Sequence, residues 1–195
     1  MITFIEIKNT WQDIEKTLEE KFPKLNFTLN KGASISEIEI FEKYLGYKLP
    51  LEFKFSYMVH NGQNYGNGLF GHERLLTLEE IIQNHRMMTL EFGDEQDYPK
   101  SDNYPNQFKW RAWHQKWIRF TEFECDGFVL DMTPEPKGFT GQIFYRHNVQ
   151  FRENISSKSF YDWLIYYKEL IKTDKVYLDE YGELELDDWL NYETI

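Results

Sequence analysis

Cysteine is almost absent from this chain. Only one of the 195 residues, Cys125, is a cysteine, so an intramolecular disulfide is excluded and a reducing compartment is favoured. Residues 1–6 carry neither the basic region nor the apolar core of a secretory signal. No apolar run approaches the ~18 residues that a membrane-spanning helix needs. These absences predict a cytoplasmic protein that does not enter a membrane.

Basic residues are outnumbered by acidic ones. The chain has 22 Lys and Arg against 33 Asp and Glu, which gives a formal net charge of −11 at pH 7. A protein with this charge does not release counterions from a nucleic-acid backbone, so direct binding to DNA or RNA is disfavoured. The same field attracts a basic protein. The composition therefore predicts a protein partner with positive charge.

The usual signatures of metal, cofactor and catalytic sites are also missing from the sequence. Five histidines are scattered without H-x-x-x-H spacing, and one cysteine completes no ligand set. Residues 66–71 match G-x-G-x-x-G, but they follow a predicted helix and the Asn61-Gly62 turn, where a dinucleotide site needs a strand. We interpret them as a turn. No G-x-S-x-G motif occurs, and the sequence predicts no metal, no cofactor and no enzyme.

Helices are predicted mainly in the first half of the chain. Ser34 and Glu37, and again Thr77 and Glu80, have the spacing of a capping box, in which two side chains satisfy backbone amides at a helix start. Gly46 suits the left-handed residue that ends a helix. Together with apolar periodicity, these signals predict helices over residues 10–22, 35–45, 50–60, from 78 onward, and 157–171.

Strands are predicted after a long surface loop over residues 93–106. Short β-branched or aromatic runs alternate there with turn residues. Their brief connections favour antiparallel pairing, since parallel strands need long crossovers. The predicted strands cover residues 117–120, 127–131, 141–145 and 150–152. The predicted fold class is α+β, with helices packed on one antiparallel β-sheet.

Three acidic residues, Glu122, Glu124 and Asp126, alternate in sequence and would share one face of a strand. Paired carboxylates can perform acid–base catalysis, while like charges on a solvated face also keep a sheet edge soluble or contact a protein. We favour the charged outer face or a partner-binding surface. Cys125 lies between two of these acids, whose charge disfavours the thiolate that a nucleophile requires.

The C-terminal tail carries most of the net charge. Residues 174–195 contain eight acidic residues and one basic residue. Such a block is commonly a solvated tail, but this one also holds more apolar residues than a purely solvating segment would. It either docks on the core or forms an acidic and aromatic binding element. Its candidate partner contacts are Asp179, Glu180, Tyr181, Glu183, Glu185, Asp187, Asp188 and Trp189.

An ordered series of short motifs resembles the SUKH superfamily, the Smi/Knr-type domain. The series covers about residues 30 to 170, in order and with plausible spacing. Its members are Gly32-Ala33-Ser34, Leu45-Gly46-x-x-Leu49-Pro50, Asn61-Gly62, Leu76-Thr77-Leu78-Glu79-Glu80-Ile81, Trp117-Ile118-Arg119-Phe120, Gly127-x-x-x-x-Asp131-x-x-Pro134, Gly138-x-x-Gly141-Gln142-Ile143 and Ser159-Phe160. At about 150 residues per domain, we expect one SUKH domain over 30–171, an N-terminal extension with a helix over 1–29, and an acidic-aromatic extension over 172–195.

The resemblance implies a small α+β domain that binds proteins and has no catalytic residue set. Bacterial members are mostly immunity proteins that neutralise polymorphic or contact-dependent toxins, often nucleases. A fungal branch regulates cell-wall assembly and glucan synthesis through protein contacts. The leading hypothesis is an immunity protein whose acids occlude the active site of a basic toxin domain. The alternative is a regulatory scaffold in cell-wall assembly or signalling, and fold alone does not decide between them.

Overall fold

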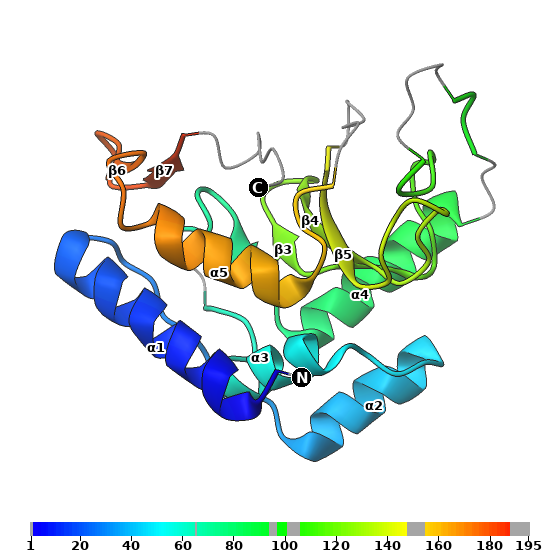
Figure 1. Cartoon of the computed structure of the whole chain (residues 1–195), viewed down its shortest axis with the longest axis horizontal. Helices are drawn as coiled ribbons and strands as arrows, with labels where there is room; N and C mark the ends of the chain where they lie inside the picture. The colour runs from blue at the N-terminus through cyan, green and yellow to red at the C-terminus, as the bar shows by residue number, and fades with distance from the viewer. Residues whose placement is uncertain (1, 65, 94–96, 101–105, 148–154, 188–195) are drawn as a thin grey trace.

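The computed structural model describes residues 2–64, 66–93, 97–100, 106–147 and 155–187. Most of its helices come first along the chain and most of its short antiparallel strands follow, which confirms the α+β prediction (Figure 1). Within the described ranges, no helix combines the length and the apolar character that crossing a bilayer requires. The helices are α1 (Phe4–Lys21), α2 (Ile35–Leu45), α3 (Leu51–Val59), α4 (Leu78–Phe92) and α5 (Phe160–Leu170).

Local sequence signals set most helix ends. Both predicted capping boxes form: Ser34 caps α2 and Thr77 caps α4, each with reciprocal bonds to the glutamate three residues later. Gly46 ends α2 with φ 80°, the left-handed conformation expected of it. Helix α1 begins six residues earlier than predicted, because Thr3 and Glu6 form a further capping box. Periodicity located these helices, and the caps fixed their ends.

The strands are all antiparallel and are divided among three sheets, where a single sheet was expected. Phe120 joins two of these sheets, because its amide donates to the Phe128 carbonyl and its carbonyl accepts from Leu76. The described strands are β2 (Trp117–Arg119), β4 (Gly127–Asp131) and β5 (Gln142–Arg146) in one sheet, β1 (Arg74–Leu75) with β3 (Thr121–Glu122), and β6 (Val176–Leu178) with β7 (Leu184–Leu186). The predicted strand over 150–152 lies outside the described residues.

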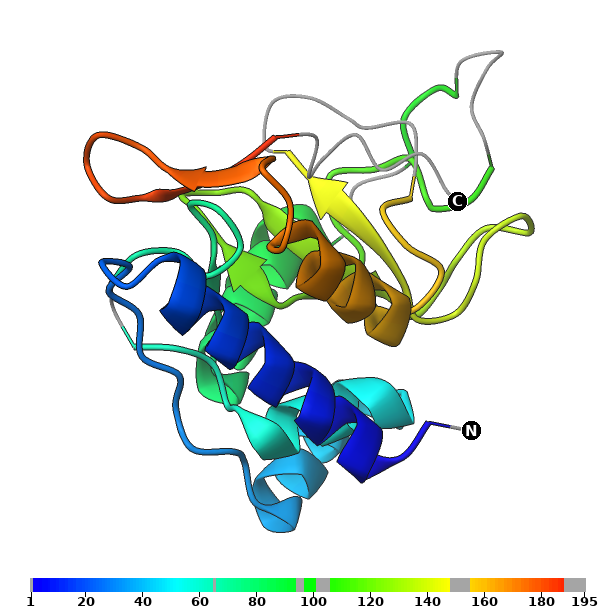
Figure 2. The same ribbon diagram turned by 60° about the vertical axis from the view of Figure 1, so that its left-hand side comes forward.

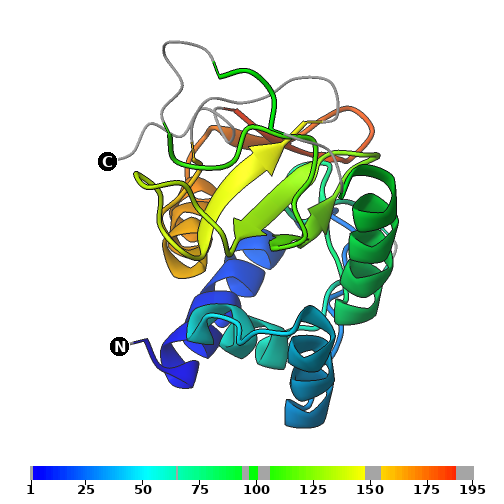
Figure 3. The same cartoon turned by 90° about the vertical axis from the view of Figure 1, so that its right-hand side faces the viewer.

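Strand β4 is central and buried on both faces. Phe128 and Leu130 belong to the main core, while Val129 belongs to a second hydrophobic cluster. Side chains alternate across a strand, so each face of the sheet has its own apolar layer. Figure 3 shows β4 and β5 with α5 to one side and α4 to the other. Trp113 and Trp117 are fully buried in the second cluster.

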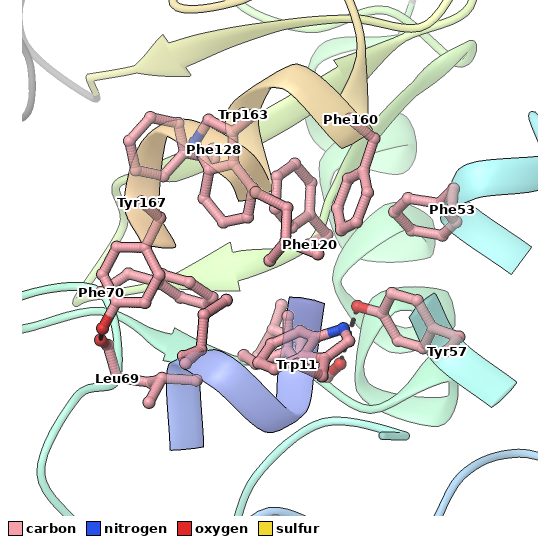
Figure 4. Packing of buried hydrophobic residues seen from close by; sticks show 14 of the residues in the cluster. Trp11, Phe53, Tyr57, Leu69, Phe70, Phe120, Phe128, Phe160, Trp163 and Tyr167 are labelled. Atoms are coloured by element: carbon pink, nitrogen blue, oxygen red, sulfur yellow. Dashed lines mark hydrogen bonds between the residues drawn. The ribbon is translucent and has the colours of Figure 1, made fainter. Parts of the chain in front are cut away.

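Helices α1, α3 and α5 pack against one another around the main core (Figure 2). The predicted extension 1–29 supplies α1, whose buried side chains Ile7, Trp11, Ile14 and Leu18 join that core. Aromatic rings from distant segments fill its centre, as Figure 4 shows. Two of the buried rings are held by hydrogen bonds: Trp11 Nε1 donates to Ser56 Oγ at 2.9 Å, and the Tyr57 hydroxyl donates to the Leu76 carbonyl at 2.9 Å. Large rings with satisfied polar ends supply much apolar area from few positions.

Candidate partner-binding site

The segment that follows β3 is a tight turn. The amide of Asp126 donates to the Phe123 carbonyl at 2.9 Å, and the Phe123 amide returns a bond to Asp126. Glu124 adopts φ 54°, the left-handed region. The prediction that Glu122, Glu124 and Asp126 share one strand face is therefore wrong. The strand ends at Glu122, and the three carboxylates differ in their ion-pair partners and in their exposure.

Glu122 is held in an ion-pair network. Its carboxylate lies 2.9 Å from Arg119 Nη2 and 3.2 Å from Arg74 Nη2. Arg119 is 3% exposed, so its charge depends on Glu122 for neutralisation in a poorly solvated site. Arg74 also pairs with Glu80 at 2.7 Å. Glu122 therefore supports the structure, and two arginines offset its charge.

The other two acids of the turn have different surroundings. Glu124 is exposed. Asp126 pairs through Oδ2 with Nδ1 of His147 at 2.7 Å. Of these two carboxylates, Glu124 is the one whose side chain is available to a partner.

The acidic tail docks on the core as a hairpin of β6 and β7. Val176 and Leu184 are 2% and 0% exposed and belong to the main core. Leu186 Cδ1 would lie only 3.3 Å from a Cβ added at Gly71, where φ is +76°. The tail therefore docks on the core, at least over the described residues up to Asp187. The candidates Asp188 and Trp189 lie outside the described residues.

The remaining candidate contact residues of the tail lie in or near the turn between β6 and β7, and they differ in their hydrogen bonds and exposure. Asp179 Oδ1 accepts hydrogen bonds from the amides of Tyr181 and Glu183, so it stabilises the turn. Tyr181 is 81% exposed at the tip. Glu180 and Asp187 are also exposed. These residues remain predicted contacts.

His72 ties the hairpin to the turn after β3. Its Nε2 lies 2.9 Å from Glu185 Oε1. Its ring lies against Phe123, with centroids 5.1 Å apart and an interplanar angle of 31°. Phe123 is 43% exposed. The two acidic segments predicted separately are therefore joined through one histidine and one aromatic ring.

A cavity of about 580 Å³ opens where these segments meet. We call it the acidic cavity; its lining residues are Gly66, Gly68, His72, Arg74, Glu122, Phe123, Glu124 and Glu183. A pocket of about 160 Å³, here called the aromatic pocket, shares His72 and Phe123 with it. The aromatic pocket is lined by Phe70, Gly71, His72, Glu73, Phe123, Tyr145, Glu185 and Leu186. The structure thus brings four of the predicted acids, from two distant segments, to adjoining cavities.

The glycine-rich segment 66–71 forms part of the wall. It runs through bends into β1, as the turn interpretation predicted, and no helix opens at its third glycine. A Cβ on Gly68 would lie 2.2 Å from the Gly71 carbonyl oxygen, so only glycine fits there. The G-x-G-x-x-G match thus arises from close backbone approach beside the acidic cavity.

Glu73 was missed by sequence reasoning. It is 5% exposed, and its carboxylate accepts hydrogen bonds from the hydroxyls of Thr121 and Tyr145. Burial raises the pKa of Glu73 to about 7, although these hydrogen bonds oppose the rise. The available signal in the sequence was the position of Glu73, a single acid between Phe70 and the apolar residues Leu75 and Leu76. Among the described residues, no three His, Cys, Asp or Glu are grouped to hold a metal ion.

Comparison with known protein families matches residues 32–166 to the SMI1/KNR4 family (SUKH-1). This match covers more than half of the chain. The chain belongs to the SMI1/KNR4 family. The resemblance read from the ordered motifs is thereby confirmed.

Fungal members of the SMI1/KNR4 family are among the curated relatives. The chain is 23% identical to the glucan synthesis regulatory protein of Neurospora crassa, over 89% of this chain and 40% of the relative. It is 23% identical to the cell wall biosynthesis/cell cycle regulator smi1 of Schizosaccharomyces pombe, over 89% and 38%. It is 28% identical to KNR4/SMI1 homolog 2 of Debaryomyces hansenii, over 70% and 30%. The chain therefore spans 30% to 40% of the length of these relatives.

The matched family region does not contain the whole site. Residues 66–124 of the acidic cavity lie inside the matched range 32–166, whereas Glu183 and Glu185 lie beyond it. The SMI1/KNR4 core thus supplies one wall, and the docked tail hairpin supplies the other.

Proposed function

We propose that this chain is a regulatory protein-binding domain that holds a positively charged segment of a partner protein in the acidic cavity. Two of its fungal relatives are named as regulators, of glucan synthesis and of cell-wall biosynthesis and the cell cycle. The convergence of Glu124 with Glu183 around one cavity carries the proposal. Like charges gather there without a pairing partner for each of them, which is typical of a surface built for an oppositely charged ligand.

The charges of the cavity support a cationic partner. Glu122, Glu124 and Glu183 line it together with one arginine, Arg74, which is already shared between Glu122 and Glu80. The excess is negative, in a chain whose net charge is −11. Complementary charge raises association rates and rejects wrong partners more than it adds affinity. The domain would act by binding, in the cytoplasm, without catalysis of its own.

A regulatory role in cell-wall assembly or signalling agrees with the names of the fungal relatives, and it takes precedence over toxin immunity. The net charge of −11 also suits an immunity protein that blocks a basic toxin domain, and this remains the second candidate. The two roles differ in their partners, since a scaffold holds several weakly and an immunity protein holds one tightly. Residues 1–29 and 172–195 would be additions to the 30–171 domain in either case.

The test is capture of partners by the tagged chain from its native host, with washes at low and moderate salt and identification by mass spectrometry. The cavity variant is the double substitution Glu124→Gln and Glu183→Gln. Its matched control is Glu19→Gln with Glu20→Gln, two exposed acids on α1 that line neither cavity. Salt-sensitive capture of wall or signalling proteins that only the cavity variant loses supports the proposal.

Two other outcomes of the capture experiment would contradict the proposal. One stoichiometric toxin domain, lost on the same substitution, establishes immunity and replaces the regulatory role. Capture that both double variants retain in full overturns the acidic cavity as the binding site.

A further inference from the structure

The aromatic pocket has a volume and a lining that suit one long side chain. Its volume is about 160 Å³, and its apolar walls include Phe70, Phe123, Tyr145 and Leu186. Phe70 and Tyr145 are 1% and 6% exposed, so these walls are fixed by core packing. Phe70 lies 4.7 Å from Trp163, and Tyr145 lies 5.0 Å from Phe128, between ring centroids. Walls anchored in this way keep their geometry when the pocket is filled.

Glu73, a buried acid that none of the proposed contacts uses, is among the residues that line this pocket. Glu73 is 5% exposed, and its hydrogen-bond donors are the neutral hydroxyls of Thr121 and Tyr145. Arg119 is the cation whose charge acts on Glu73, but Arg119 bonds to Glu122 and to the Cys125 carbonyl. A buried carboxylate without a cation of its own is costly. A cation at hydrogen-bond distance, which Arg119 is not, would therefore stabilise the ionised form of Glu73.

We propose that the aromatic pocket binds a lysine side chain of the partner, with the ammonium group at Glu73 and the methylene stem between Phe123, Tyr145 and Leu186. This inference rests on the proposed function, because the same basic segment would continue into the acidic cavity through the shared walls His72 and Phe123. Lysine combines an apolar stem with a charged end, which matches apolar walls around one carboxyl group.

Lysine fits this pocket better than arginine. A guanidinium group prefers two free carboxylate oxygens, which it binds as a planar fork. The oxygens of Glu73 already accept bonds from two hydroxyls. An ammonium group is a compact point charge and needs fewer free lone pairs. Arginine side chains of the partner would instead be placed in the wider acidic cavity, near Glu124 and Glu183.

Binding of lysine at Glu73 is coupled to a proton. An ammonium group favours the ionised carboxylate, so binding lowers the pKa of Glu73 from about 7 and releases its proton. The affinity should rise as pH is raised from 6 to 8. Other titratable groups around the pocket are His72, Glu185 and Tyr145, and Asp126 acts on Glu73 while paired with His147. Protonation of His72 would change affinity in the same direction, so Glu73 itself has to be followed.

The experiment follows the side-chain carboxyl carbons of the glutamates in the full chain by NMR, from pH 5 to 9. The probe is acetyl-hexalysine amide, and acetyl-hexaarginine amide is the charge-matched control. Saturation with hexalysine should lower the titration midpoint of Glu73 by at least about one unit, which corresponds to a tenfold affinity gain across the transition. Hexaarginine should perturb Glu124 and Glu183 and leave the midpoint of Glu73 where it is.

Two results overturn the inference, and they are distinguishable. If hexalysine perturbs Glu124 and Glu183 but not Glu73, the lysine pocket is wrong and the acidic cavity stands. If hexalysine perturbs none of the three, the lysine pocket and the proposed cation-binding cavity fail together. Equal shifts of Glu73 with both peptides would refute the selectivity for lysine.

Variants give a second, independent reading of the pocket. Glu73→Gln should flatten the pH dependence of hexalysine affinity between pH 6 and 8 and leave only the part that His72 contributes. Phe123→Ala should weaken hexalysine binding about fivefold, in line with the loss of one aromatic wall and its attraction for a cation. Phe139→Ala is the matched control, since Phe139 is 45% exposed against 43% for Phe123 and lines neither cavity. An unchanged affinity in Phe123→Ala, or equal losses in both phenylalanine variants, contradicts the proposal.

Discussion

In the aromatic core, Trp11 of α1, Phe120 beside β3 and Trp163 of α5 come together from distant parts of the chain. In the acidic cavity, Glu124 and Glu183 do the same. Each ring added to the core removes apolar area from water and stabilises the fold. Each carboxylate added to the cavity repels the others. The hairpin places Glu183 at the cavity because Leu184 and Val176 are buried in the core. Buried apolar side chains therefore stabilise the molecule, while the acids beside them are the groups that a partner would contact.

The two regions meet at Phe70 and Tyr145. Both rings pack within the aromatic core, and both line the aromatic pocket. A ligand in this pocket would therefore contact the edge of the core. Tyr145 also donates to Glu73, so the chemistry of the site and the packing of the core share one side chain.

The largest effect should follow from a change within the core. Trp163 is 2% exposed, and its ring contacts Phe70, Phe120, Phe128 and Phe160. Trp163→Ala should lower the free energy of unfolding by about 3–5 kcal/mol, from lost burial and the cavity left behind. Urea denaturation measures this loss. Tyr181→Ala, at an 81% exposed position, should change stability by less than about 0.5 kcal/mol, and similar losses in both variants would contradict the comparison.

A smaller effect should appear where the core meets the site, and it should depend on pH. The pKa of Glu73 is raised by burial from 4.5 to about 7. Between these values the folded chain keeps the Glu73 proton and the unfolded chain has lost it, so stability falls as pH rises. The full difference corresponds to about 3 kcal/mol. Urea denaturation at pH 5 and pH 8 should show a flatter dependence in Glu73→Gln than in the original chain.

The pH prediction has its own control. Glu91→Gln changes an exposed acid on α4 that lines neither cavity, and it should keep the original slope. Asp131, whose pKa burial raises to about 6, contributes a slope of the same sign in every variant. A slope in Glu73→Gln equal to that in Glu91→Gln would show that Glu73 titrates alike in the folded and unfolded chains.

The smallest effect separates two acids of the same turn. Glu122→Gln leaves the 3% exposed Arg119 without its charged partner, and it should cost about 1–2 kcal/mol of stability. Glu124→Gln changes an exposed side chain and should cost less than about 0.5 kcal/mol, while it weakens capture of the partner. Urea denaturation and the capture assay, run on both variants, measure the two properties. Equal stability of the two variants would mean that the Arg119 network contributes nothing measurable.

Interactions between near neighbours in sequence explain why most helices could be predicted. Ser34 bonds Glu37, and Thr77 bonds Glu80, whatever the rest of the chain does. The start of α1 was placed too late because the equivalent pair of Thr3 and Glu6 was not recognised. The Thr3 and Glu6 pair is local in sequence, so this helix end does not depend on tertiary structure.

The prediction of one acidic strand face failed for a different reason. Alternation implies a shared face only if the strand continues, and Glu124 takes a left-handed conformation that ends it. The tail presented the same difficulty, because its composition allowed docking or solvation. Leu184 is buried in the main core, so docking is the alternative that occurs. The spacing of the acids in the sequence does not predict this contact.

The helices, the α+β class, the net charge and the family could all be predicted from the residues alone, because caps, periodicity and ordered motifs act over short distances along the chain. Tertiary structure alone decided that Glu124 and Glu183 line one cavity and that Glu73 lies buried beside it. Those relations require a hairpin near the C-terminus to dock on Gly71, and burial sets the pKa of Glu73. Contacts between distant segments, and the burial that they cause, depend on how the whole chain packs, so no local sequence pattern predicts them.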